Sequence, residues 1–286
     1  MALLQAFDGQ MDKISLQKML FLFTQRQVKA EYDFIPYRLG CYSFSVNADL
    51  TTMVKKGILS ETTTHFRSNE TVDYIQTLKE ADRKLLQEIK SRYGKMDARA
   101  LMKHTYINFP YWGINSIKAK EILSIDEFER IKNSKPQNEK TILYTIGYEG
   151  ISLERYLNKL LKNDVKVLVD VRNNPKSMKF GFSKNGLQRF CASLGIEYAH
   201  FPEVGIQSEQ RRELKGEDDY DRLFSDYREN NLTATTNSQL KILQLLETKK
   251  RIALTCFEAN ICQCHRKHLA EAIANFPDFK YEVKHI

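Results

Sequence analysis

The sequence predicts an α/β protein built from two domains, and three observations support this prediction. Apolar residues recur at helical spacing in residues 1–132, which favours a mainly helical, winged-helix-like domain. Short apolar runs alternate with amphipathic stretches in residues 141–286, which is typical of βαβ units and a mostly parallel, Rossmann-like sheet. The polar residues 133–140 separate the two and are predicted to form a linker.

The composition is that of an ordinary globular protein, because 42% of the 286 residues are hydrophobic and 28% are charged. No apolar run reaches the roughly 18 residues of a membrane-spanning helix, so no membrane association is expected. The N-terminus lacks the basic start and apolar stretch of a signal peptide. The cysteines number five, and three of them crowd into residues 256–264, which disfavours a disulfide framework. We therefore expect a cytoplasmic protein with reduced thiols.

The formal net charge of +8 is spread evenly along the chain. Lys and Arg outnumber Asp and Glu by 21 to 17 before Lys140, and by 23 to 19 from Lys140 onward. A basic surface suits a nucleic acid, with DNA favoured, or a nucleotide, because each neutralised phosphate releases counterions. Many basic proteins bind neither, so that alternative stays open. The sequence does not indicate an oligomeric state.

The first half has the order of elements that is typical of a winged-helix module. In chain order these are a helix over residues 12–29, a turn at 37–40, a helix from Asn47 to Gly57, a hairpin over 58–64 and a helix over 72–93. Four aromatic residues then cluster with Lys103 and His104, namely Tyr106, Phe109, Tyr111 and Trp112. Such rings can stack on bases, although they pack a core more often.

Three segments of the first half carry a resemblance to a known family. Residues 16–22, 37–42 and 56–59 are similar to the Panacea-type antitoxin domain. The resemblance is consistent with a binding domain, and with a toxin–antitoxin regulator as one alternative for the whole chain.

The second half alternates between strands and helices. Strands are predicted over residues 141–147, 165–171, 197–201, 251–256 and 281–284, and helices over 152–161, 185–194, 240–246 and 266–276. The charged residues 207–231, with Arg211, Arg212, Arg222 and Arg228, are predicted to form either a solvated helix or a cover over the site.

Every predicted strand of this half delivers polar residues to its carboxyl end, where open α/β sheets bind their ligands. The residues in chain order are Gly147, Tyr148 and Glu149, then Asp170 and Arg172, then His200, then Cys256 and Glu258, and finally Cys264, His265 and Arg266. Because parallel strands end at one edge of a sheet, we expect these side chains to meet there.

Two carboxylates at this edge suggest proton chemistry. If Glu258 lies beside Asp170, its pKa is raised and it can act as a general acid while Asp170 stays ionised. His200 is a candidate base or hydrogen-bonding guide, and a structural histidine is the alternative. An ion pair between Asp170 and Arg172 is the alternative for these two residues, because alternation places both on one side of the strand.

The residues around 264–266 open a predicted helix, whose N-terminus favours anions and lowers the pKa of a thiol. Arg172, Arg266 and His265 are therefore candidates for binding substrate, together with Gly147, Tyr148 and Glu149. Cys256 and Cys264 are candidate nucleophiles. Zinc is an alternative for Cys256, Cys262, Cys264 and His265, but paired Cys-x-x-Cys motifs are absent, so neither a metal nor a cofactor is predicted.

Five motifs in residues 141–286 resemble the domain-of-unknown-function family 488. They are TIGYEG at 145–150, DVR at 170–172, GFSK at 181–184, GIEY at 195–198 and CFE to CHR at 256–266. The resemblance implies a fold and brings no activity with it.

The leading hypothesis is a hydrolase that acts on a nucleic acid or nucleotide and cleaves a base–sugar (N-glycosidic) bond. Such an enzyme could act in defence against foreign DNA. One alternative is a non-catalytic nucleotide sensor or toxin–antitoxin regulator. A second alternative is a thiol-dependent enzyme.

Overall fold

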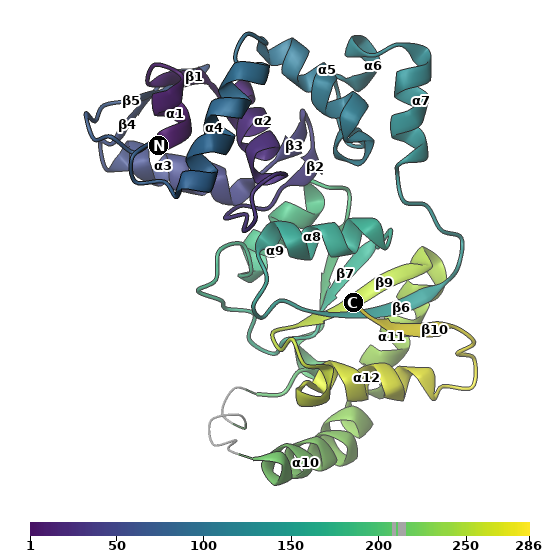
Figure 1. The fold of residues 1–286 in the computed structure, drawn as a ribbon. Coiled ribbons are helices and arrows are strands. Elements are labelled where there is room, and N and C mark those ends of the chain that lie inside the picture. The colour runs from purple at the N-terminus through teal and green to yellow at the C-terminus, as the bar shows by residue number, and fades with distance from the viewer. Residues whose placement is uncertain (208–209, 211–215) are drawn as a thin grey trace. The chain divides into compact units, whose positions relative to one another are not determined.

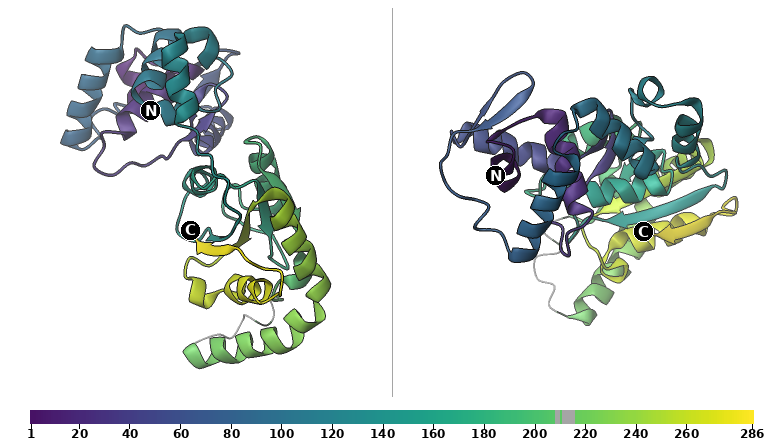
Figure 2. Two further views of the ribbon diagram at one scale, coloured as in Figure 1. Left: turned by 90° about the vertical axis from the view of Figure 1, so that its right-hand side faces the viewer. Right: turned by 45° about the horizontal axis from the view of Figure 1, so that its top comes forward.

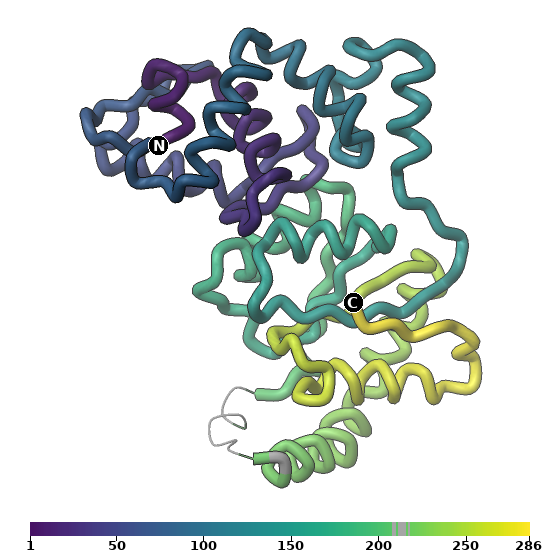
Figure 3. Tube along the Cα trace, in the orientation of Figure 1, coloured from purple at the N-terminus to yellow at the C-terminus, as the bar shows by residue number. Residues whose placement is uncertain are grey.

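The chain divides into two compact units, Met1–Lys135 and Pro136–Ile286. The computed structural model describes residues 1–207, 210 and 216–286 (Figure 1). The boundary between the units falls within the polar segment 133–140, whose residues from Pro136 onward run as an extended connection in the chain trace (Figure 3). In the described part of the chain, no helix combines the length and the apolar composition that crossing a membrane requires.

The N-terminal unit is mainly helical, as predicted, and its first elements follow the winged-helix order (Figure 1). Its helices are α1 (Ala2–Ala6), α2 (Lys13–Thr24), α3 (Phe44–Lys55), α4 (Glu80–Tyr93), α5 (Ala98–Asn108), α6 (Ala119–Ile122) and α7 (Ile125–Asn133), with the turn η1 (Pro110–Gly113). Its strands are β1 (Gln10–Asp12), β2 (Ile35–Tyr37), β3 (Gly40–Tyr42), β4 (Leu59–Glu61) and β5 (His65–Ser68). Strands β1, β5 and β4 form an antiparallel sheet in that order, and β2 pairs with β3.

Local side-chain hydrogen bonds explain where two of these helices begin. Helix α3 starts earlier than expected because the Ser43 hydroxyl accepts the N–H of Val46 at 3.2 Å and caps the helix. Helix α4 starts later than expected, at Glu80. The Asp73 carboxylate accepts the N–H groups of Ile75 and Gln76, and this local turn competes with a helix.

The aromatic cluster near residue 110 belongs to the core. Phe21 makes edge contacts with Phe109 and Trp112, with ring centroids 5.1 and 5.6 Å apart. Tyr106 is buried as well. The structure therefore favours packing over base stacking for these rings.

The C-terminal unit contains a parallel five-stranded sheet in its described residues, which confirms the predicted fold class. The strands are β6 (Ile142–Gly147), β7 (Val167–Asp170), β8 (Glu197–His200), β9 (Arg251–Cys256) and β10 (Glu282–His285), in the order β10-β6-β9-β7-β8. Every neighbouring pair is parallel, and β10 forms one edge (Figure 2). The central strands β6, β7 and β9 are buried along nearly their whole length, which explains their continuous apolar sequences.

Helices cover both faces of this sheet. Helices α8 and α9 lie on one face, and α11 and α12 lie on the other (Figure 1). The helices are α8 (Leu153–Lys162), α9 (Lys184–Ala192), α10 (Glu217–Asp226), α11 (Thr236–Lys249) and α12 (His265–Ala274), with the turns η2 (Pro202–Val204), η4 (Tyr227–Leu232) and η5 (Ile261–Gln263). Apolar side chains from α11, α12 and the facing side of the sheet form one core.

Helical structure occupies much of the charged region that was predicted as a solvated helix or a cover. Arg222 lies in α10, and Arg228 lies in η4, a single π-helical turn. Arg211 and Arg212 lie outside the described residues.

A buried thiol in α9 leads to a pH-dependence prediction. Cys191 is fully buried, and burial raises its pKa to about 12, with a further contribution from the charge of Asp170. Above about pH 9 the unfolded thiol ionises while the folded one keeps its proton, so stability falls as pH rises toward 12.

We expect urea unfolding between pH 8 and 11 to reveal this decline, with a slope of up to about 1.4 kcal/mol per pH unit from this one group. Cys191→Ala removes that share of the slope, whereas the same change at the exposed Cys262 leaves it in place. Equal slopes in the wild type and Cys191→Ala would contradict the assignment.

Candidate functional site

The carboxyl ends of four neighbouring strands stop at the same level of the C-terminal sheet. Gly147 of β6 is paired with Cys256 of β9. Asp170 of β7 is paired with Thr255 of β9 and with His200 of β8. The residues that follow these strand ends therefore lie along one edge of the sheet, where ligands of this fold class bind.

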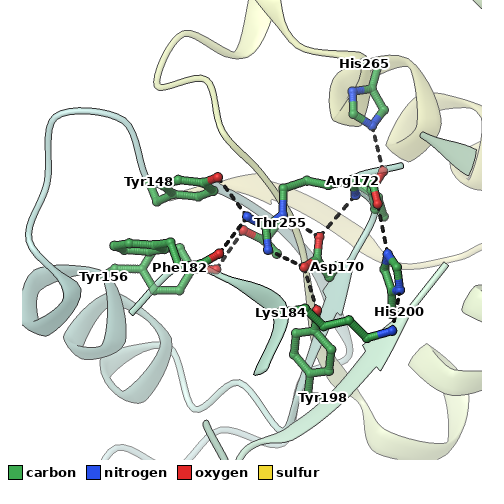
Figure 4. Close-up of polar contacts among 11 residues, drawn as sticks. Tyr148, Tyr156, Asp170, Arg172, Phe182, Lys184, Tyr198, His200, Thr255 and His265 are labelled. Atoms are coloured by element: carbon green, nitrogen blue, oxygen red, sulfur yellow. Dashed lines mark hydrogen bonds and ion pairs between the residues drawn. The ribbon is translucent and has the colours of Figure 1, made fainter. Parts of the chain in front are cut away.

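Asp170 and Arg172 form a buried, bidentate ion pair at this edge (Figure 4). Arg172 Nε donates to Asp170 Oδ1 at 2.8 Å, and Arg172 Nη2 donates to Oδ2 at 2.5 Å. The backbone N–H of Arg172 and the hydroxyl of Tyr198 donate to the same carboxylate at 3.1 and 2.6 Å. Four donors thus occupy both oxygens of a carboxylate that is 0% exposed.

These four hydrogen bonds to the carboxylate affect the roles predicted for Asp170 and Arg172. A carboxylate whose oxygens are engaged by four donors is poorly placed to exchange a proton, so the geometry favours the ion-pair alternative for Asp170. Burial acts to lower the pKa of Arg172, but the hydrogen bonds and charge of Asp170 outweigh burial and raise it. Arg172 Nη1 donates to the hydroxyl of Tyr148 at 2.8 Å and to the carbonyl of Phe182 at 2.9 Å. The guanidinium therefore positions protein groups.

Aromatic rings pack beside the guanidinium of this pair (Figure 4). Tyr148 stacks on Phe182 with ring centroids 4.3 Å apart and an angle of 10° between the rings. The ring of Tyr156 meets both edge-on, and its hydroxyl donates to Thr255 Oγ1 at 2.7 Å (Figure 4). Of these residues, sequence reasoning selected only Tyr148 as a site residue.

Two histidines bind successive carbonyls at the end of β7. His200 Nε2 lies 2.9 Å from the carbonyl of Arg172, and His265 Nε2 lies 3.0 Å from the carbonyl of Val171 (Figure 4). Because a carbonyl only accepts, both Nε2 atoms carry hydrogen. The Nδ1 atom of His200 accepts from Lys184 Nζ at 3.0 Å, so both nitrogens of this ring are engaged. This geometry favours a structural role for His200.

The second ring nitrogen of His265 faces a cluster of thiols. His265 Nδ1 lies 3.7 Å from Cys256 Sγ, and the ligand atoms of Cys256, Cys264 and His265 all lie within 4.8 Å of one another. Glu258 Oε2 lies 3.1 Å from Cys256 Sγ. Burial raises the pKa of Cys264 to about 12, with further contributions from Cys256. Without a ligand, Cys264 is therefore a poor nucleophile at neutral pH.

In the described structure, Arg266 is a buried cation with unpaired hydrogen-bond donors. The side chain is 2% exposed, and within the described residues neither Nε nor Nη1 has a hydrogen-bond partner. Nη2 makes a long contact of 3.4 Å with the carbonyl of Ala259. Burying unpaired N–H groups of a charged side chain costs several kcal/mol, so this arrangement suits an anionic or carbonyl-bearing ligand.

The loop after β9 is fixed against the loop after β6, which brings the main-chain carbonyl of Glu258 close to the guanidinium of Arg266. The N–H groups of Tyr148 and Glu149 donate to the carbonyl of Phe257, and Glu149 Oε2 accepts the N–H of Ala259 at 2.9 Å. A Cβ on Gly147 would lie 1.9 Å from the Glu258 carbonyl oxygen and 3.1 Å from Arg266 Nη2. Only a glycine allows this approach.

A polar cavity of about 370 Å³ opens beside the ends of β7 and β8. Amide and carboxylate side chains dominate its lining: Asn173, Glu203, Gln207, Asp226, Asn230 and Asn231. Within the described residues the Oδ1 atom of Asn231 is buried without a partner. The Tyr227 ring also lines the cavity and meets the His265 ring edge-on at 5.5 Å. Sequence reasoning missed this cavity because η4 supplies much of its wall.

Residues 152–273 match the model of the family described as Domain of unknown function DUF488. No curated protein and no solved structure matches the chain. The resemblance of the first half to the Panacea-type antitoxin domain stays a prediction.

The DUF488 match includes most of the predicted site. Asp170, Arg172, His200, Glu258 and Arg266 lie within it, whereas residues 147–149 precede it. The structure brings Cys256, Glu258, Cys264 and His265 into one cluster, and Arg266 lies beside the same loop. The exposed Cys262 is not part of the cluster.

Proposed function

We propose that the DUF488-like unit is a hydrolase that cleaves the base–sugar bond of a nucleotide or nucleic acid, and that the winged-helix-like unit contributes nucleic-acid binding. The observation that carries this proposal is Arg266, a buried guanidinium with two nitrogens that have no partner in the described structure, near the main-chain carbonyl of the half-buried Glu258. A permanent cation and a carboxylate at one sheet edge are the two charges that this cleavage requires.

The chemistry assigns one role to each residue. The bond between sugar carbon and base nitrogen breaks, and its electron pair leaves with the base. Arg266 donates hydrogen bonds to the base or phosphate oxygens that gain negative charge. The Glu258 carboxylate stabilises the cationic sugar and takes a proton from the attacking water, which adds to the sugar carbon. That proton then passes to the departed base, which balances the reaction.

The amide-rich cavity supports a nucleobase as the recognised group. Asn173, Asn230 and Asn231 offer donors and acceptors that match the edge of a base, and the buried Oδ1 of Asn231 is an acceptor without a partner in the described structure. The spread net charge of +8 supports phosphate contacts. In this proposal Asp170, Arg172 and His200 position the site and do not touch substrate.

Release of free base from nucleosides, nucleotides, and single- and double-stranded DNA and RNA tests the activity by chromatography. Glu258→Gln removes the proton acceptor and is expected to reduce the rate by about 10²-fold while binding is kept. Glu282→Gln, on the exposed strand β10, is the matched control and keeps the wild-type rate. Wild-type turnover by Glu258→Gln would refute the role of this residue.

The salt dependence of DNA binding tests the partner separately. If phosphates are contacted, log Kd rises linearly with log salt concentration. Binding without base release by the wild type would favour the sensor alternative. A flat salt response would exclude phosphate contacts.

A further inference from the structure

The cluster of Cys256, Cys264 and His265 has the composition of a metal site. Cys256 ends β9, and Cys264 and His265 open α12, so two rigid elements hold the donors. All three side chains are at most 3% exposed. Their ligand atoms lie within 4.8 Å of one another, a separation that a small ion bridges with minor side-chain adjustment.

We propose that these three side chains bind a zinc ion, or a metal ion of the same class, as a one-histidine, two-cysteine site. Zinc–sulfur and zinc–nitrogen bonds of about 2.3 and 2.0 Å place sulfur and nitrogen about 3.5 Å apart in a tetrahedron. Cys256 Sγ and His265 Nδ1 are already 3.7 Å apart. The inference concerns metal binding and stands or falls independently of base–sugar hydrolysis.

The orientation of His265 is an independent argument for the metal. Its Nε2–H donates to the carbonyl of Val171 at 3.0 Å, and its Nδ1 faces the thiols, so Nδ1 is the nitrogen placed to bind a metal. Metal-binding histidines characteristically donate their other N–H to a carbonyl or carboxylate, because this bond fixes the tautomer and the ring plane.

Three protein ligands leave a fourth tetrahedral position, which is the arrangement of catalytic zinc sites. Glu258 Oε2, 3.1 Å from Cys256 Sγ, lies beside the cluster and is less buried than the three ligands. We assign the fourth position to water and place Glu258 outside the ligand set, where its carboxylate accepts a proton from that water. One histidine, two cysteines and a neighbouring glutamate form the set with which zinc nucleobase deaminases activate water.

The test is metal analysis of the full chain purified without an affinity tag. We expect about one zinc per chain by elemental analysis, as a single tetrahedral site requires. Replacement of zinc by cobalt should then produce cobalt–thiolate absorption. Cys256→Ser, Cys264→Ser and His265→Ala should each weaken cobalt binding by at least about tenfold, in proteins whose circular dichroism shows a folded chain.

The controls use residues next to the site. Cys262→Ser changes an exposed thiol two residues from Cys264 and should bind cobalt like the wild type. Glu258→Gln should also keep the metal. The absence of zinc and of a cobalt–thiolate spectrum in both the wild type and Cys262→Ser would overturn the site and favour a metal-free thiol–imidazole pair. Loss of the metal in Glu258→Gln would overturn the open fourth position.

Discussion

Asp170→Ala is expected to lower the free energy of unfolding of the C-terminal unit by about 3–5 kcal/mol, because it leaves the charge of Arg172 buried without its counterion. Arg172 is 6% exposed and donates three of its hydrogen bonds to this carboxylate. The hydroxyl of Tyr198 loses its acceptor at the same time. Urea unfolding followed by circular dichroism measures the loss.

Two further variants separate the ion pair from general damage to the unit. The double variant Asp170→Ala with Arg172→Met removes the orphaned charge, so it should lose less stability than Asp170→Ala alone. Glu282→Ala breaks an exposed pair with Lys284 and should cost no more than about 0.5 kcal/mol. A double variant as unstable as the single one would show that the buried charge is not the cause.

Gly147→Ala is expected to destabilise the unit by about 3 kcal/mol and to displace the loop that carries Glu258. The new methyl group would lie 1.9 Å from the Glu258 carbonyl oxygen, a main-chain atom that can retreat only if the loop moves. Thermal unfolding measures the cost, and base release measures the effect on the site.

Gly150→Ala is the matched control in the same loop. Gly150 has a φ of +71° and no atom within 4 Å of the added Cβ, so its substitution introduces backbone strain of about 1–2 kcal/mol without a clash. If Gly150→Ala proved as harmful as Gly147→Ala, close approach to Glu258 would not be the reason for a glycine at position 147.

The parallel sheet was predictable because its strands are buried on both faces. Runs such as residues 165–171 and 251–256 have no polar face, and they are separated by amphipathic helices, which is a pattern of βαβ units. The shared edge followed from strand direction alone. Alternation also predicted that Asp170 and Arg172 lie on one side of the chain.

The hydrogen-bond partners that decide the roles of these residues could not be predicted from the sequence. Tyr198 reaches Asp170 from a neighbouring strand, and Lys184 reaches His200 from α9, so the first contact depends on strand order and the second on the packing of the helix. The tautomer of His265 depends on the carbonyl of Val171, 94 residues away in the chain. The polar cavity depends on the packing of η4 against the loop after β8. The spacing of residues along the sequence does not predict these contacts between distant segments.

The strand order β10-β6-β9-β7-β8 also determines when the sheet of the C-terminal unit can form during translation. Strand β9 pairs with both β6 and β7, although it begins 104 residues after the end of β6 and 81 residues after the end of β7. Until Arg251–Cys256 leave the ribosome, two apolar strands present open edges, which invites association with other nascent chains. The same late segment carries Cys256, and Glu258 and Arg266 follow it, so a partly made chain cannot assemble the site before β9 is available to join β6 and β7.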